Sequence, residues 1–149
     1  MKGQKGMTIA ELVVAIAASG IIVVFLGTAI YQIFNISGYG NDRLTATHEL
    51  ENIAHWFNID GQEAKVATGG STLTLTMADD SSITYTLAGT EMRRTSGSGE
   101  MILAHNITSA SFEIDTRLVT MSLTSSPPGR YGVSESGTYI VYLRPEESG

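Results

Sequence analysis

The sequence predicts an α+β fold in which one long N-terminal helix packs on an antiparallel β-sheet. An uncharged apolar stretch covers residues 12–31, an amphipathic helical pattern follows at residues 42–64, and short alternating segments fill most of the remainder. Because the helical patterns come first and the strand patterns follow, we expect a long helix laid on a single antiparallel sheet.

The apolar stretch is long enough to cross a membrane. Residues 12–31 are twenty consecutive positions without a charge. At 1.5 Å per residue, a helix of this length spans about 30 Å, which is the thickness of a bilayer hydrocarbon core. Glu11 lies at its edge, and a carboxylate at the centre of a membrane helix costs on the order of 2.5–3.5 kcal/mol. We therefore expect Glu11 to need a partner.

The second helical pattern has one apolar face, because its apolar residues recur at intervals of three and four. This face holds Ala46, Leu50, Ile53 and Phe57, widened by Trp56 and Ile59. The opposite, solvated face is expected to hold Asp42, Arg43, Glu49, Glu51 and Asn52. Gly38 and Gly40 precede the pattern, and each costs up to about 1 kcal/mol in a helix interior, so we expect a bend or local melting there.

The strand patterns begin with a β-hairpin. Residues 71–77 and 82–87 alternate polar and apolar side chains on either side of a polar turn. Further strands are expected at residues 91–95, 101–104, 107–115, 119–123 and 138–143, and a Ser/Pro/Gly-rich loop at residues 125–137.

The start of the chain combines a short basic segment with the apolar stretch. Lys2 and Lys5 precede Gly6, and Met7-Thr8-Ile9-Ala10-Glu11-Leu12 follows, with Glu11 fifth from Met7. This start resembles the precursors of type IV pilins and type II secretion pseudopilins, in which Lys2 and Lys5 would match the basic leader, Gly6 the residue before the cleavage site and Met7 the new N-terminus. The family usually has Phe in place of Met7, and many of its major pilins carry a Pro near position 28, which this chain lacks. The resemblance covers about the first thirty residues.

The resemblance implies a processed filament subunit with three parts: a prepilin leader at 1–6, a transmembrane and filament-core helix at 7–34, and a globular domain at 35–149. A prepilin peptidase would cleave after Gly6 and Met7 would be N-methylated. Glu11 would act in assembly by pairing with the α-amino group of Met7 on a neighbouring subunit. The implied partners are the peptidase, other pilin or pseudopilin subunits, and membrane lipid before assembly.

The resemblance also implies a location and favours one kind of subunit. The chain would cross the cytoplasmic membrane once, with its basic N-terminus in the cytoplasm and its C-terminal domain outside, before it joins a cell-surface or periplasmic filament. The cysteine-free, strand-rich run at 71–124 is similar to larger accessory subunits, which favours a minor pilin or pseudopilin over a major pilin.

Two alternatives lead to different proteins. An ordinary signal peptide or signal anchor would also show a basic start and an apolar run, but its cleavage site normally follows the apolar region and it gains nothing from Glu11. A single-pass anchored binding or sensory module would share the architecture without a filament role. Cleavage at Gly6 would separate this second alternative from a filament subunit.

The sequence points to neither catalysis nor a cofactor. His48, Glu51, Asn52 and His55 share a helix face but lack a further strong ligand, and Asp79-Asp80 lacks the calcium-loop pattern. Arg93 and Arg94, with Tyr85 and Tyr131, form at most a small cationic patch. The formal charge is −6, and it becomes −8 once Lys2 and Lys5 are removed, which disfavours nucleic-acid binding. We therefore expect no enzyme activity, no metal and no cofactor.

Overall fold

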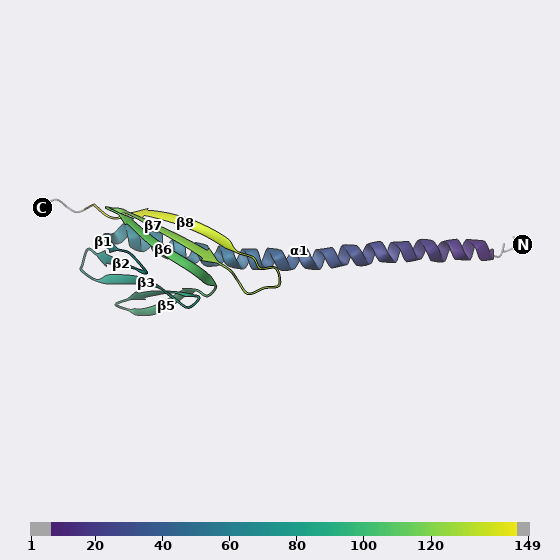
Figure 1. The fold of residues 1–149 in the computed structure, drawn as a ribbon, viewed down its shortest axis with the longest axis horizontal. Helices are drawn as coiled ribbons and strands as arrows, with labels where there is room; N and C mark the ends of the chain where they lie inside the picture. Colours follow the sequence, from purple (N-terminus) through teal and green to yellow (C-terminus); the bar gives the residue numbers. More distant parts are fainter. Residues whose placement is uncertain (1–6, 146–149) are drawn as a thin grey trace, which may run out of the picture. The chain divides into compact units, whose positions relative to one another are not determined.

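The computed structural model of the 149-residue chain describes residues 7–145 and has the predicted α+β architecture. A long helix, α1 (Ile9–Glu63), is followed by strands only (Figure 1). By its internal contacts the chain divides between Gly38 and Tyr39. We call residues 7–38 the helical unit and residues 39–145 the sheet unit.

The helix is unbroken through Gly38 and Gly40, so the predicted local melting is wrong. Two glycines together cost about 2 kcal/mol relative to alanine, whereas interrupting a helix forfeits several hydrogen bonds and requires a new nucleus. In the following turn the Thr45 hydroxyl donates to the Asn41 carbonyl at 3.0 Å.

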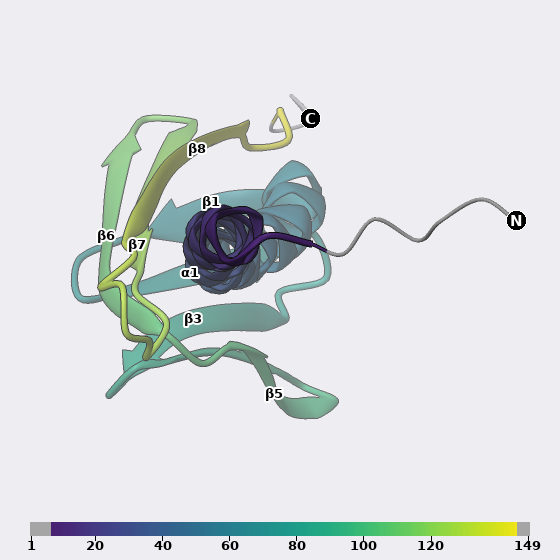
Figure 2. The same cartoon turned by 90° about the vertical axis from the view of Figure 1, so that its right-hand side faces the viewer.

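The strands form two sheets, and the expectation of a single sheet is wrong. The first sheet has the order β1-β2-β3-β4-β5 and the second the order β6-β7-β8, with every neighbouring pair antiparallel. The strands are β1 (Ala64–Thr68), β2 (Thr72–Met77), β3 (Ser82–Ala88), β4 (Glu91–Ser96), β5 (Gly99–Ala104), β6 (Ile107–Asp115), β7 (Leu118–Ser125) and β8 (Glu135–Tyr142). Figure 2 shows them curving around one side of α1, with β8 on one flank and β3 and β5 on the other.

Strand β1 is missing from the sequence prediction. Its sequence, AKVAT, is short, the residues that meet the core are the small Ala64 and Ala67, and Val66 is 45% exposed. Pairing with β2 defines it instead, from Ala64 opposite Met77 to Thr68 opposite Thr74. The remaining strand predictions are confirmed with boundaries that differ by at most a few residues.

The apolar face of α1 predicted from its periodicity forms the centre of the core. Ala46, Leu50, Ile53 and Phe57 are at most 4% exposed, and Phe57 meets the ring of Tyr85 edge to face at 6.5 Å. The inward residues of both sheets close the core: Leu73, Leu75, Met77, Met92, Phe112, Val119, Met121, Leu123 and Val141. Ile59 was wrongly assigned to this face, because it is 40% exposed.

Glu49 is also placed wrongly by the helical pattern, which put it on the solvated side. Its carboxylate accepts hydrogen bonds from Ser125 Oγ at 2.7 Å and from Asn106 Nδ2 at 2.6 Å. Ser125 ends β7 and is fully buried, while Asn106 lies between β5 and β6. Glu49 therefore joins the helix to the second sheet and to the connection between the two sheets.

Candidate assembly site

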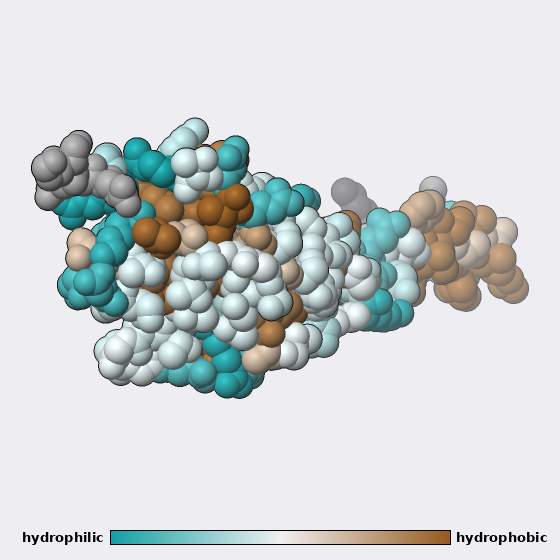
Figure 3. All heavy atoms as spheres, turned by 60° about the vertical axis from the view of Figure 1, so that its left-hand side comes forward, coloured by the Kyte–Doolittle hydropathy of each residue, from teal (hydrophilic) through white to brown (hydrophobic). Residues whose placement is uncertain are grey.

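The helical unit exposes apolar side chains all round. Within the part of the chain that the structure describes, no residue of this unit is buried, and its large apolar residues from Met7 to Ile36 are 50–84% exposed. Figure 3 shows this part of the surface as brown, whereas most of the sheet-unit surface in view is pale or teal. α1 contains a segment long and apolar enough to cross a membrane. Such a surface needs lipid or other apolar helices around it.

The first turn of α1 is closed by a capping box. The Thr8 backbone N–H donates to Glu11 Oε2 at 2.8 Å, the Thr8 hydroxyl donates to the same oxygen at 2.9 Å, and the Glu11 N–H donates to Thr8 Oγ1 at 3.3 Å. Thr8 precedes the first helical residue, Ile9, and Glu11 is three positions after it, which is the Thr-x-x-Glu arrangement of this motif. The carboxylate also lies at the positive end of the helix dipole.

The capping box could have been found from the sequence, since Thr8-x-x-Glu11 immediately precedes an apolar run. The resemblance predicts only an intermolecular partner for Glu11. In the structure both bonds to Glu11 go to Oε2, which leaves Oε1 for a donor from outside residues 7–145. Glu11 thus has a local role in starting the helix, and its role in assembly stays a prediction.

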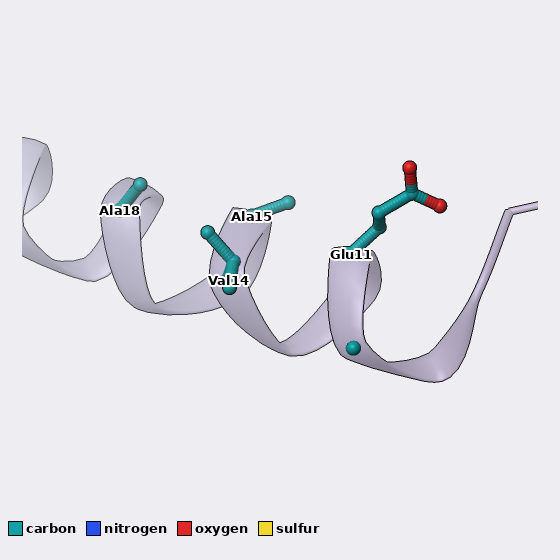
Figure 4. Close-up of a pocket in the computed structure, with 5 residues that line it drawn as sticks. Glu11, Val14, Ala15 and Ala18 are labelled. Atoms are coloured by element: carbon teal, nitrogen blue, oxygen red, sulfur yellow. The ribbon is translucent and has the colours of Figure 1, made fainter.

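Small residues follow Glu11 on the same side of the helix. Figure 4 shows Glu11 with Ala15 and Ala18 on the next turns, and together with Ala10 and Val14 these residues line a shallow hollow. Short side chains allow a second helix to approach closely, as small residues do at helix interfaces in membranes. The carboxylate stands at one end of this hollow.

Of the residues predicted for processing and assembly, the structure describes Met7 and Glu11, and Met7 is 67% exposed. Gly6, Lys2 and Lys5 lie outside the described residues. The structure places Met7 one residue before the capping Thr8 and four before Glu11, at the beginning of the helix.

Arg93, Arg94, Tyr85 and Tyr131 do not form a common surface patch. Arg94 points inward and forms a two-pronged ion pair with Asp60, at 2.7 Å from Nε and 2.8 Å from Nη2, while its guanidinium lies 4.9 Å from the Trp56 ring centroid. Arg93 points outward and pairs with the carboxylates of Glu91 and Glu100. Tyr131 stacks edge to face with Tyr39.

The Asp60–Arg94 pair belongs to the core. The Asp60 and Arg94 side chains are 4% and 13% exposed, and Tyr85 also donates its hydroxyl to Asp60. Burial, followed by the hydrogen bond to Asp60, raises the pKa of the Tyr85 phenol far above its ordinary value, so the phenol stays protonated and acts as a donor. This network joins α1 to β3 and β4, and the sequence gives no periodic signal for it.

The other candidate ligand residues are not brought together. His48 lies 3.6 Å from Glu51 on an exposed helix face, whereas Asn52 donates to the Leu103 carbonyl of β5 at 2.7 Å. Asp79 accepts hydrogen bonds from Ser81 within the β2–β3 turn, and Asp80 pairs with Lys65. Among residues 7–145, no three His, Cys, Asp or Glu side chains gather closely enough to hold a metal ion.

In the comparisons with known proteins, no family model, curated protein or solved structure matches the chain. The residues and geometry described above therefore carry the functional argument.

Proposed function

We propose that this protein is a structural subunit of a type IV pilus or pilus-like filament, of the minor pilin or pseudopilin kind. The observation that carries the proposal is an apolar helix, exposed on all sides, with one carboxylate in its first turn. The sheet unit buries its own core, so the helical unit is the part of the chain that requires other molecules.

In this proposal the chain first uses the membrane and then other subunits as its apolar surroundings. Lipid covers residues 12–31 before assembly, with the N-terminus in the cytoplasm and the sheet unit outside. A prepilin peptidase removes residues 1–6, and Met7 gains a free, N-methylated α-amine. Helices of neighbouring subunits then replace lipid, and the sheet unit faces outward.

Glu11 directs this step by pairing with the Met7 amine of a neighbour. An α-amine with a pKa of about 7.7–8.0 is largely protonated at neutral pH, and each charge offsets the desolvation of the other in a water-poor bundle. The capping box fits this role, because it fixes the carboxylate while it occupies only Oε2. Before cleavage Met7 has only an amide nitrogen, so processing and pairing are coupled.

Two variants separate pairing from capping. Glu11→Val removes both roles, whereas Thr8→Val removes the hydroxyl of the capping box and leaves the carboxylate. We expect both proteins to enter the membrane and to be cleaved at Gly6. Glu11→Val should be about tenfold or more depleted from sheared filaments, as loss of a buried charge pair implies, while Thr8→Val is incorporated nearly normally.

The measurement is immunoblotting of sheared filaments against the membrane fraction, with N-terminal sequencing of both. Equal depletion of the two variants would show that Glu11 acts only as a cap. Wild-type incorporation of Glu11→Val would rule out the assembly role of Glu11. A mature N-terminus other than Met7, or absence of the wild-type protein from sheared filaments, would favour a membrane-anchored binding or sensory module without a filament role.

A further inference from the structure

The strands at the margins of the two sheets are not equally protected against pairing with another chain. With the orders β1-β2-β3-β4-β5 and β6-β7-β8, the four edge strands are β1, β5, β6 and β8. An edge strand presents a row of backbone N–H and C=O groups, and natural proteins block such a row with bulges, charged side chains or proline. An edge strand without these features is therefore a surface on which another strand can pair.

Three of the four edge strands contain a bulge. The additional residue is Lys65 in β1, Leu103 in β5 and Thr108 in β6, where the register against the neighbouring strand shifts. A bulge bends its strand and interrupts regular pairing. In β5 the Leu103 carbonyl is also taken, since it accepts a hydrogen bond from Asn52 of α1 at 2.7 Å. The same three strands carry charged residues, which are Lys65, Glu100, Glu113 and Asp115.

Strand β8, which the structure describes in full, has neither a bulge nor a charge beyond its first residue. It pairs with β7 without interruption, from Tyr142 opposite Leu118 to Glu135 opposite Ser125. After Glu135 the strand reads SGTYIVY, with no charged residue and no proline. Ile140 and Tyr142 are 55% and 72% exposed. β8, at the upper margin of the sheet unit in Figure 1, is thus a regular, uncharged edge with apolar side chains in solvent.

Alternate residues of β8 direct their backbone groups away from β7. The Leu143 N–H donates to the Arg117 carbonyl at 2.9 Å, so Leu143, which directly follows the strand, faces β7. In an antiparallel pair, residues that face the partner strand alternate with residues that face away. Within residues 7–145, no other element forms a backbone hydrogen bond with the residues that face away. These residues are Ser136, Thr138, Ile140 and Tyr142.

The core holds β8 in a conformation that is ready for pairing. Val141 is 3% exposed, and its side chain lies so close to α1 that a Cβ at Gly61 would meet Cγ2 at 2.8 Å. On the outer face, the Ser136 hydroxyl lies 2.9 Å from that of Thr124 in β7. Because β8 is already ordered, binding of a strand to its edge does not include the entropic cost of ordering it.

We propose that the free edge of β8 binds an extended segment of another protein, which adds to the second sheet as a fourth strand. Main-chain hydrogen bonds supply affinity in such strand addition, and alternate side chains supply specificity. The side chains of the segment that lie beside Ile140 and Tyr142 are apolar. This edge belongs to the sheet unit, so the interaction does not depend on the filament role.

Net charge determines which kind of segment is attracted. Without Lys2 and Lys5 the chain has seven Lys and Arg against fifteen Asp and Glu, so a segment flanked by Lys or Arg is favoured. A second copy of this chain has the same excess of negative charge and is disfavoured at the edge. The occupant is therefore a basic, extended segment of a different polypeptide.

The test uses the full chain, labelled with ¹⁵N, in uncharged detergent micelles, with the probe peptide Lys-Thr-Val-Thr-Val-Tyr-Val-Lys. Without peptide, the amides of Thr138 and Ile140 should exchange with solvent about tenfold or more faster than those of Tyr139 and Val141, which face β7. Millimolar peptide should slow the exchange of Thr138 and Ile140 about tenfold or more and leave Tyr139 and Val141 unchanged. Amide hydrogen exchange followed by NMR measures all four residues at once.

Two substitutions in β8 and one matched control locate the site. Ile140→Lys should weaken peptide binding roughly tenfold, since it places a like charge on the edge. Val66→Lys adds the same charge at a 45%-exposed apolar position of the bulged edge strand β1 and should change the dissociation constant by at most about twofold. Thr138→Pro removes one N–H of the free edge, keeps the bonds to β7 and should abolish the slowing at Ile140. Unchanged resonances of β2 and β3 verify that each variant is folded.

A peptide with Glu in place of both Lys residues tests the charge preference and should bind about threefold or more weakly. Equal binding of the two peptides, or equal effects of Ile140→Lys and Val66→Lys, would overturn the proposal. Unchanged exchange at millimolar peptide would also overturn it. Slow exchange of Thr138 and Ile140 without peptide, increasing with protein concentration, would overturn it as well, because a second copy would then occupy the edge.

Discussion

Helix α1 runs through both units of this protein, but the exposure of its apolar side chains differs between them. In the helical unit, the large apolar side chains of residues 7–36 are at least half exposed. In the sheet unit, Ala46, Leu50, Ile53 and Phe57 of the same helix are at most 4% exposed. Both segments are α-helical, so backbone conformation does not explain the difference in exposure. The segments differ in whether apolar side chains from the rest of the chain pack against them.

The two segments also handle carboxylates differently. Glu11 is satisfied by Thr8, three residues away in its own first turn, and stays exposed. Asp60 is satisfied by Arg94 and Tyr85, which are 34 and 25 residues away, and is buried. A polar group that depends on local partners survives without tertiary structure, whereas one that depends on distant partners requires the complete fold. The sheet unit therefore buries its own core, whereas the apolar side chains of the helical unit stay uncovered within residues 7–145.

The largest effect should come from a charge placed on each helix segment. Ile53→Asp buries an unpaired carboxylate at a fully buried position and should destabilise the sheet unit by about 4 kcal/mol or more. Ile21→Asp lies at an exposed position of the helical unit and should leave sheet-unit unfolding unchanged, while it impairs membrane insertion. Thermal unfolding followed by near-UV circular dichroism measures the first effect and membrane fractionation the second. Equal melting curves for wild type and Ile53→Asp would mean that the wrong helix face has been assigned to the core.

Removal of Arg94 should have the next largest effect. Arg94→Leu leaves the Asp60 carboxylate buried without its cation and should cost about 3–5 kcal/mol. The neighbouring Arg93→Leu is the matched control, because Arg93 pairs with exposed partners on the outer face and should change the melting temperature little. Urea denaturation of both variants compares them. A similar loss of unfolding free energy in Arg94→Leu and Arg93→Leu would mean that loss of the Asp60–Arg94 ion pair is not the cause.

Gly61 and Gly40 of α1 test whether helix propensity or side-chain packing determines the effect of a glycine-to-alanine substitution on stability. A Cβ at Gly61 would meet the Val141 side chain, with Cγ2 at 2.8 Å, whereas one at Gly40 would meet no atom within 4 Å. Gly61→Ala should therefore destabilise by about 1–3 kcal/mol through overpacking, and Gly40→Ala should stabilise by up to about 1 kcal/mol. Denaturant midpoints measure both changes. Val141→Ala should restore part of the loss in Gly61→Ala, and failure of this rescue would exclude the contact as its cause.

The smallest effect should follow removal of the helical unit itself. A fragment that begins at Gly38 should fold as a soluble monomer, with an unfolding free energy within about 0.5 kcal/mol of the full chain, because no core residue is lost. A fragment that begins at Asn41 also loses the Tyr39–Tyr131 ring contact and should be weaker by about 0.5–1.5 kcal/mol. Ultracentrifugation and thermal unfolding check both. Aggregation of the longer fragment would contradict the independence of the sheet unit.

The sequence by itself determined the features that depend on neighbours along the chain. Apolar periodicity of three and four placed Leu50, Ile53 and Phe57 in the core, and strict alternation located the β2–β3 hairpin, because both patterns reflect local backbone geometry. The uncharged stretch of membrane length can also be recognised from the sequence. The same holds for the Thr8–Glu11 capping box, whose residues lie three positions apart.

Only the tertiary structure decided what depends on residues far apart in sequence. The division into two sheets, the existence of β1, the burial of Asp60 and the attachment of Glu49 to Ser125 and Asn106 all arise from contacts across tens of residues. The position of β8 at the edge of its sheet is of the same kind, since strand order is set by pairing between separate segments. Periodicity describes one element at a time, so it cannot state which element a polar side chain will meet.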